Sequence, residues 1–112
     1  MNKWRLPTVK ELITLVDYSY ICPATNSDMI RASVYWTSTE AVSGKIAFTV
    51  DFTYGTVNYH NKNDFKFVIA VRKTDEGKLE WCEDITAVSM TWKEAIAWCD
   101  KTNEVKNGFT RS

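Results

Sequence analysis

Two segments of the chain have the apolar spacing of a helix that begins at a capping box. In residues 8–17, Thr8 and Glu11 stand in the T-x-x-E arrangement, in which each side chain can accept a hydrogen bond from the backbone beside the other. Apolar residues then recur at intervals of three and four, namely Val9, Leu12, Ile13 and Val16. The same box opens residues 91–101, where one face carries Trp92, Ala95, Ile96 and Cys99. We therefore expect two short helices, one near each end of the chain.

The chain between these helices is rich in β-branched and aromatic residues, which favour strands. Residues 65–72 are nearly all apolar, which is typical of a central strand covered on both faces. Turn signals at Tyr54-Gly55 and Asp75-Glu76-Gly77 join neighbouring strands closely, so most of the pairing should be antiparallel. The pattern predicts four or five strands, over residues 34–39, 45–52, 56–59, 65–72 and 79–82.

These elements predict the fold class α+β, with two short helices packed on a small, mainly antiparallel sheet. A chain of 112 residues and 12.9 kDa has too little material for a second core, so residues 1–112 should form a single domain. Residues 22–33 and 58–64 are polar and aperiodic, and we expect both stretches to be surface loops.

Charge and hydropathy exclude several classes of function. Lys plus Arg and Asp plus Glu both number 14, and this balance argues against direct nucleic-acid binding and against a polybasic membrane surface. Apolar runs reach only about five residues, far below the roughly 20 that span a bilayer. Because no apolar segment follows Met1, we expect no secretory signal and a cytoplasmic location; a fragment of a longer protein could be extracellular.

The cysteines are too few for a disulfide scaffold, and their odd number leaves at least one free thiol. They are Cys22, Cys82 and Cys99, and none has metal-ligand spacing to another cysteine or to a histidine. We therefore expect a reducing environment, no metal and no cofactor. A Cys82–Cys99 bridge remains sterically conceivable if the two segments pack together.

Four short motifs follow one another along residues 4–72. They are Trp4-Arg5-Leu6-Pro7-Thr8 with Glu11-Leu12, Tyr35-Trp36-Thr37-Ser38-Thr39, Val50-Asp51-Phe52 with Gly55, and Val71-Arg72. In this order they resemble the signature of the Legionella collagen-like protein C-terminal domain family. The resemblance implies a compact C-type-lectin-like fold related to that of formylglycine-generating enzymes. It also implies a binding or adhesion module, with no general catalytic activity.

The order of parts differs from that of the family. Residues 91–99 resemble a family helix that lies before the W-R-L-P motif, so the resemblance makes 1–73 the family core and 74–112 the strand and helix that normally precede Trp4. This order implies a circular permutation, a cut through a tandem array, or a swapped dimer or oligomer. In each case we expect residues 91–99 to dock beside residues 4–17 and complete one hydrophobic centre. The family often has a cysteine where Ala70 stands, so Cys99 lacks the partner that the family would supply.

Residues on the matched motifs are interpreted as structural. We expect the tryptophans to lie in the core and the charged side chains to form a buried or half-buried ionic network that orients loops, because buried charges usually need partners. These residues are Trp4, Arg5, Glu11, Trp36, Asp51, Arg72 and Trp92.

The contact surface is predicted on the loops 18–33, 40–45 and 53–64, because exposed tyrosines bring a large area at low entropy cost. The candidate binding residues are Tyr18, Tyr20, Tyr54, Tyr59, His60 and Lys62. His60, the only histidine, has no companion for catalysis or metal binding and is assigned to a solvated loop. Nearby asparagines could ligate calcium through oxygen, but they do not reproduce an EF-hand loop.

Two hypotheses about function remain. The first is a non-enzymatic binding module whose loops recognise a protein or a glycan. The second is a phage or mobile-element inhibitor that binds and blocks a host protein, for example a component of a defence system. An enzyme is not expected, because the sequence contains no visible combination of nucleophile, base and orienting group.

Overall fold

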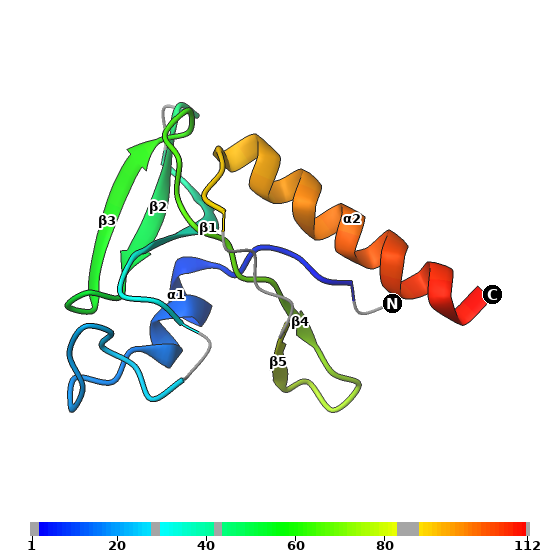
Figure 1. The fold of residues 1–112 in the computed structure, drawn as a ribbon, viewed down its shortest axis with the longest axis horizontal. Coiled ribbons are helices and arrows are strands. Elements are labelled where there is room, and N and C mark those ends of the chain that lie inside the picture. The colour runs from blue at the N-terminus through cyan, green and yellow to red at the C-terminus, as the bar shows by residue number, and fades with distance from the viewer. Residues whose placement is uncertain (1–2, 28–29, 42–43, 83–87, 112) are drawn as a thin grey trace.

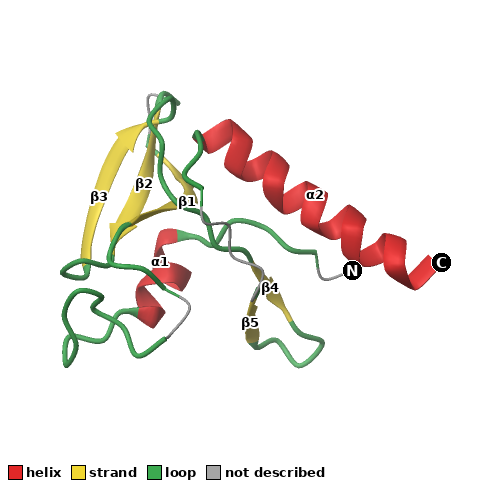
Figure 2. Ribbon diagram, in the orientation of Figure 1, coloured by secondary structure: helices red, strands yellow, loops and turns green. Residues whose placement is uncertain are grey.

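The computed structural model describes residues 3–27, 30–41, 44–82 and 88–111, and it confirms the α+β class. Two small antiparallel sheets follow one another along the chain, with a short helical segment before them and a long helix after them (Figures 1 and 2). The elements are α1 (Val9–Leu12), the 3-10 turn η1 (Ile13–Leu15), β1 (Val34–Glu40), β2 (Ile46–Asp51), β3 (Thr56–Asn61), β4 (Val71–Lys73), β5 (Leu79–Trp81) and α2 (Trp92–Arg111).

The larger sheet has the strand order β1-β2-β3, and both of its pairings are antiparallel. β2 and β3 form the predicted hairpin, with six successive residue pairs from Ile46–Asn61 to Asp51–Thr56. The smaller sheet pairs β4 with β5 across the predicted turn at Gly77. An isolated antiparallel bridge from Arg5 to Val71 ties the N-terminal segment to this second sheet.

Two hydrophobic clusters, rather than one centre, hold the elements together. Tyr35 and Trp36 are neighbours in β1 and point to opposite faces of the sheet, as the alternation of a strand requires. The Trp36 cluster is covered by α2 and consists of Trp4, Leu6, Trp36, Ala47, Val68, Ala70, Cys82, Ala95 and Cys99. The Tyr35 cluster is covered by α1 and consists of Leu12, Ile30, Tyr35, Val50, Phe52 and Ile69.

The C-terminal helix lies beside the N-terminal segment of the same chain, as the order of parts predicted. The backbone N–H of Trp4 donates to the Asn103 side-chain oxygen (2.7 Å), and the Asn103 amide donates back to the Trp4 carbonyl (2.9 Å). Ala95 and Cys99 of α2 pack in the cluster that contains Trp4. A single chain therefore supplies both covers of its sheet.

Both capping boxes are present, but both helices end elsewhere than expected. The first helix tightens into η1 and stops at Leu15, because Asp17 turns away to donate its backbone N–H to the Ala24 carbonyl (2.8 Å). The second helix was expected to end near Lys101 but runs on to Arg111. Its contact with Trp4 at Asn103 lies beyond the expected end and supports the additional turns.

Residues 65–72 are only partly the central strand that was expected. Val68, Ile69, Ala70 and Val71 are fully buried, as predicted for a segment covered on both faces. Regular strand geometry begins only at Val71, because the preceding residues pair singly, Lys66 with Met90 and Phe67 with Tyr35. Phe65, at the start of this segment, is exposed.

Candidate functional site

Large exposed side chains gather where the loop after η1 meets the β2–β3 turn. Tyr18 is 78% exposed, Tyr20 47%, Ile21 68% and Tyr54 60%. We call these four residues the tyrosine surface. Three of them were predicted contact residues. Ile21 was missed, although the run from Tyr18 to Ile21 has neither helical nor strand periodicity and so gave these apolar groups no place in a core.

Backbone hydrogen bonds fix this surface to the sheet. Cys22 donates its N–H to the Thr53 carbonyl (3.1 Å), and Ala24 donates to the Phe52 carbonyl (2.6 Å). The Tyr18 hydroxyl donates to the Gly55 carbonyl (2.8 Å) from the loop side. The two segments that carry the tyrosines are therefore held together before any partner binds, which lowers the entropy cost of binding.

Gly55 is the close contact between these two segments. Its φ is +79°, and an added Cβ would lie 2.7 Å from Val16 Cγ1 and 3.0 Å from Tyr18 Cε1. We predict that Gly55→Ala lowers the free energy of unfolding by about 1–2 kcal/mol, because the left-handed backbone and the overlap both add strain. Chemical denaturation measures this loss.

Gly44 provides the matched control. Its φ is +74°, but nothing lies within 4 Å of an added Cβ. Gly44→Ala should therefore show the backbone strain alone and a smaller loss of stability. Equal losses in the two variants would mean that the close approach at Gly55 contributes nothing.

A groove of about 600 Å³ lies at the other end of β3, where the hairpin meets the start of α2. We call it the lysine groove; it is lined by Gly44, Lys45, Asn61, Lys62, Asn63, Thr91, Trp92 and Lys93. Lys62 Nζ pairs with the Glu40 carboxylate and lies 4.0 Å from the centre of the Trp92 ring. The Trp92 indole N–H donates to the Thr37 carbonyl (2.9 Å), which fixes the ring at the groove wall.

The predicted binding residues thus divide between two places. Tyr18, Tyr20 and Tyr54 come together in the tyrosine surface, whereas Lys62 lies in the lysine groove. The six residues of β3 separate the two places, a distance of about 20 Å along an extended strand. Tyr59 lies between them and is exposed, with its ring edge-on to Phe48 at 6.3 Å.

The predicted strand over 56–59 and the predicted loop over 58–64 overlap; the structure confirms the strand and extends it to Asn61, so the loop prediction is wrong for residues 58–61. Asn58 to Asn61 belong to β3, so His60 is a strand residue and not part of a solvated loop. His60 Nδ1 lies 3.0 Å from Oγ1 of Thr49, which is fully buried on the neighbouring strand. Burial and the nearby charge of Lys66 lower the pKa of His60 below its usual value. Polar side chains are found on this strand because its exposed positions face water.

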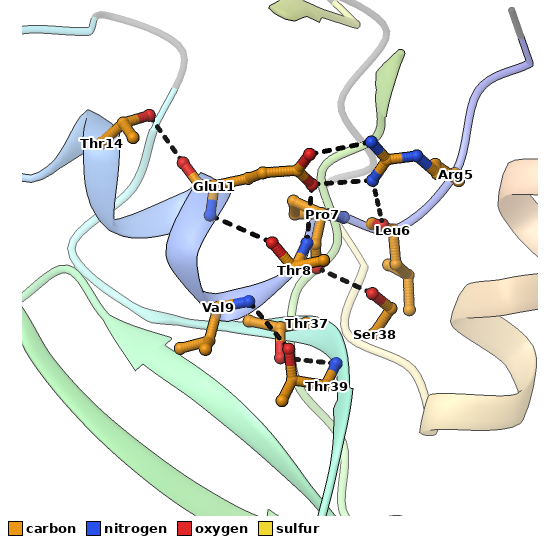
Figure 3. A network of polar contacts seen from close by, with 10 residues as sticks. All are labelled: Arg5, Leu6, Pro7, Thr8, Val9, Glu11, Thr14, Thr37, Ser38 and Thr39. Carbon is orange, nitrogen blue, oxygen red and sulfur yellow. Dashed lines mark hydrogen bonds and ion pairs between the residues drawn. The ribbon is translucent and has the colours of Figure 1, made fainter. Parts of the chain in front are cut away.

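The charged motif residues were expected to form a buried or half-buried ionic network, and instead they form separate contacts. Arg5 binds the Glu11 carboxylate with two hydrogen bonds of 2.7 and 2.8 Å (Figure 3). Arg72 instead pairs with Glu80 at 2.8 Å, and its guanidinium lies 4.5 Å from the centre of the Trp4 ring. Asp51 accepts the Thr53 backbone N–H (2.8 Å) and so holds the β2–β3 turn.

Glu11 is the most strongly perturbed carboxyl of this group. The hydrogen bonds from Arg5, with the Thr8 backbone N–H (2.9 Å), lower the pKa of Glu11 to about 2. Figure 3 also shows the Val9 backbone N–H donating to the Thr39 hydroxyl (3.0 Å) and the Ser38 hydroxyl donating to the Pro7 carbonyl (3.4 Å). Together these contacts fix the start of the helix against β1.

The cysteines differ in their surroundings. Cys22 is exposed, whereas Cys82 and Cys99 are both buried in the Trp36 cluster. Burial raises the pKa of Cys99 to about 12, so this thiol is not a nucleophile at neutral pH.

In the described part of the chain, no three His, Cys, Asp or Glu side chains gather as a metal site would require. Among those residues there is also no helix with the length and apolar character needed to cross a membrane.

The comparisons with known proteins give one match. The family model of the Lcl C-terminal domain matches residues 1–72, which contain α1, the β1-β2-β3 sheet, and the Arg5–Glu11 pair. Neither the curated proteins nor the solved structures gave a match. Because the matched residues make up well over half of the 112-residue chain, the chain belongs to the Lcl C-terminal domain family.

Proposed function

We propose that this chain is a non-enzymatic binding module that recognises a protein partner through the tyrosine surface. The observation that carries the proposal is the exposure of four large side chains on two segments that are hydrogen-bonded to each other. Exposed apolar side chains that gather in this way mark interaction sites more often than scattered ones do. Family membership supports a binding module in general and leaves the kind of partner open.

The chemistry of the surface favours a protein over a charged ligand. Tyrosine is enriched at protein interfaces because its ring buries a large area and its hydroxyl still forms hydrogen bonds. The hydroxyls of Tyr20 and Tyr54 have no intramolecular hydrogen bond among those described, so both are available to a partner. Ile21 adds an aliphatic contact that would dehydrate the centre of such an interface.

Glycan recognition is the alternative, and the lysine groove favours it. Amide and ammonium groups of Asn61, Asn63 and Lys93 line one concave site together with the ring of Trp92. Such groups hydrogen-bond sugar hydroxyls, and an aromatic ring can stack on a sugar. However, Lys62 already lies over the Trp92 ring and would have to move for stacking. We therefore place protein recognition first.

The proposal is tested with two surface variants and one control. Tyr20→Ser combined with Tyr54→Ser removes both unbonded tyrosines, and Phe65→Ser removes an equally exposed aromatic ring elsewhere. Because all three side chains are about half exposed or more, each variant should keep its free energy of unfolding within about 1 kcal/mol of the wild type. A third variant, Lys62→Gln with Lys93→Gln, removes two ammonium groups from the groove.

Immobilised wild-type protein is used to capture partners from a lysate and is also applied to a glycan array. We expect the affinity for a captured protein to fall by about tenfold or more in the tyrosine variant and to stay unchanged in the Phe65 and lysine variants. Unchanged affinity in the tyrosine variant would contradict the proposal. Binding to glycans that only the lysine variant loses would establish the alternative.

The inhibitor hypothesis is a narrower form of the same proposal. A phage or mobile-element protein that blocks a host protein would use the same tyrosine surface. The captured partner would then lose its own activity at a one-to-one ratio, and the tyrosine variant would restore that activity. A partner whose activity is unaffected would exclude the inhibitor role.

A further inference from the structure

The two edges of the larger sheet differ in whether another segment of the chain pairs with them. Along β1, the outer edge is closed by the chain itself. The backbone N–H of Trp36 donates to the Phe67 carbonyl (2.9 Å), and the backbone N–H of Ser38 donates to the Pro7 carbonyl (2.8 Å). Along β3, on the opposite side, the sheet order ends, and no described segment pairs with the outer edge (Figure 2). The outward N–H and C=O groups of β3 are therefore available to another strand.

β3 also lacks the features that usually protect an edge strand. Its sequence, Thr56-Val57-Asn58-Tyr59-His60-Asn61, contains no lysine, no acidic residue and no proline. Its six pairs with β2 run without a shift in register, so no bulge bends it away. Natural edge strands commonly use charge, proline or a bulge to prevent edge-to-edge pairing. Their absence from β3 favours pairing.

We propose that two copies of this chain associate by antiparallel pairing of their β3 strands about a two-fold axis. A second copy fits this edge because β3 has no charge that its own copy would repel. The axis is at Asn58, so Val57 lies opposite Tyr59 of the partner subunit, and Thr56 lies opposite His60 of the partner subunit. Paired residues then share a face of the joined sheet, and a β-branched residue meets an aromatic one, which is a favourable cross-strand pair.

The pairing brings together residues that a single copy keeps apart. In one chain, β3 separates the tyrosine surface from the lysine groove. In an antiparallel pair, the Tyr54 end of one strand lies beside the Lys62 end of the other, at both ends of the interface. Each tyrosine surface would then adjoin the lysine groove of the partner subunit, and a ligand could contact both.

A strand of six residues is a small interface compared with those of permanent dimers, so the association should be reversible. Sedimentation equilibrium on the full chain measures it directly. We expect the average mass to rise from 12.9 kDa towards twice that value as the concentration increases. A constant mass of 12.9 kDa up to about millimolar concentration would overturn the proposal.

Charge variants at the axis test the geometry. Asn58→Lys places two ammonium groups opposite each other, with Cβ atoms about 5 Å apart, and should shift the dimer dissociation constant upward by about tenfold or more. Asn58→Asp should weaken self-association in the same way. An equimolar mixture of the two variants should recover the dimer, and this recovery would show that both variants still fold.

The control is Val88→Lys, which adds the same charge at an exposed apolar position away from β3. It should leave the dimer unchanged. A dimer that persists in Asn58→Lys, or one that only Val88→Lys disrupts, would place the interface elsewhere and overturn the proposal. Because mass is measured and not partner capture, failure here leaves the proposed role of the tyrosine surface untouched.

Discussion

Replacement of Trp36 by alanine is expected to lower the free energy of unfolding by about 3–5 kcal/mol. The Trp36 side chain is fully buried in the cluster between β1 and α2, and its indole N–H donates to the Met90 carbonyl (2.8 Å). Alanine would leave a large cavity and remove one of the two donors to the Met90 carbonyl, which would keep only the backbone N–H of Lys66 (3.0 Å). Both losses act on the contact that joins the helix to the sheet.

Urea denaturation followed by circular dichroism measures this loss. Tyr54→Ala is the control, because it also removes an aromatic ring but from a side chain that is 60% exposed, and its cost should stay below about 1 kcal/mol. If Trp36→Ala cost no more than Tyr54→Ala, Trp36 would not belong to the core. The assignment of α2 to that face of the sheet would then be wrong.

Glu11→Ala is expected to cost about 2–3 kcal/mol at neutral pH. It removes the two hydrogen bonds to Arg5 and the acceptor for the Thr8 backbone N–H. The capping hydrogen bond and each of the two hydrogen bonds to Arg5 contribute on the order of 1 kcal/mol. The charge-assisted bonds are not stronger than this because Arg5 is partly exposed to solvent. The capping and the pairing are lost together.

The Glu11 contribution should depend on pH in a defined direction. The folded-state pKa is about 2, below the usual 4.5, so the stabilisation is fully present above about pH 4.5 and is lost as the pH falls towards 2. The difference in stability between the wild type and Glu11→Ala should therefore shrink over that interval. Unfolding free energies measured from pH 7 to pH 2 test this.

Glu80→Ala is the matched control for the pH series. Glu80 pairs with Arg72 at a similar distance, but its side chain is 46% exposed, and exposed pairs contribute little. Its effect should stay within about 1 kcal/mol at every pH. A Glu11 effect that is equally small, or that does not change with pH, would contradict the role given to the Arg5–Glu11 pair.

Local signals predicted the starts of the helices but not their ends. The capping boxes at Thr8 and Thr91 involve residues three apart, so the sequence contains all that they need. The length of α2 depends in part on the contact between Trp4 and Asn103, which are 99 positions apart. No local pattern carries that information, and tertiary contacts commonly override local propensity in this way.

For the strands too, the local sequence predicted some features, and others depend on tertiary contacts. Successive residues of a strand point to opposite faces, and in β2 the structure accordingly places Ala47 in the Trp36 cluster and Val50 in the Tyr35 cluster. The strand pattern could not indicate that Thr49 is fully buried, because that depends on which elements cover the sheet. Likewise, polar residues from Asn58 to Asn61 resemble a loop, yet an edge strand with a solvated face has the same composition.

The candidate site was predictable as far as exposure but not as far as grouping. Tyr18, Tyr20 and Tyr54 fit no core pattern, and all three are exposed. Their position at one end of the hairpin, with Lys62 at the other, depends on the register of β2 and β3 and on the hydrogen bonds of the loop after η1. Those features arise only when distant segments pack.

Hydrogen–deuterium exchange, measured on the chain alone and in complex with its captured protein partner, tests the role of the tyrosine surface most directly. We predict slower backbone exchange in residues 18–24 and 53–55 of the complex, and no change at Asn61, Lys62 or Lys93. Slower exchange confined to those three residues, with none around Tyr18 and Tyr54, would contradict the proposed function.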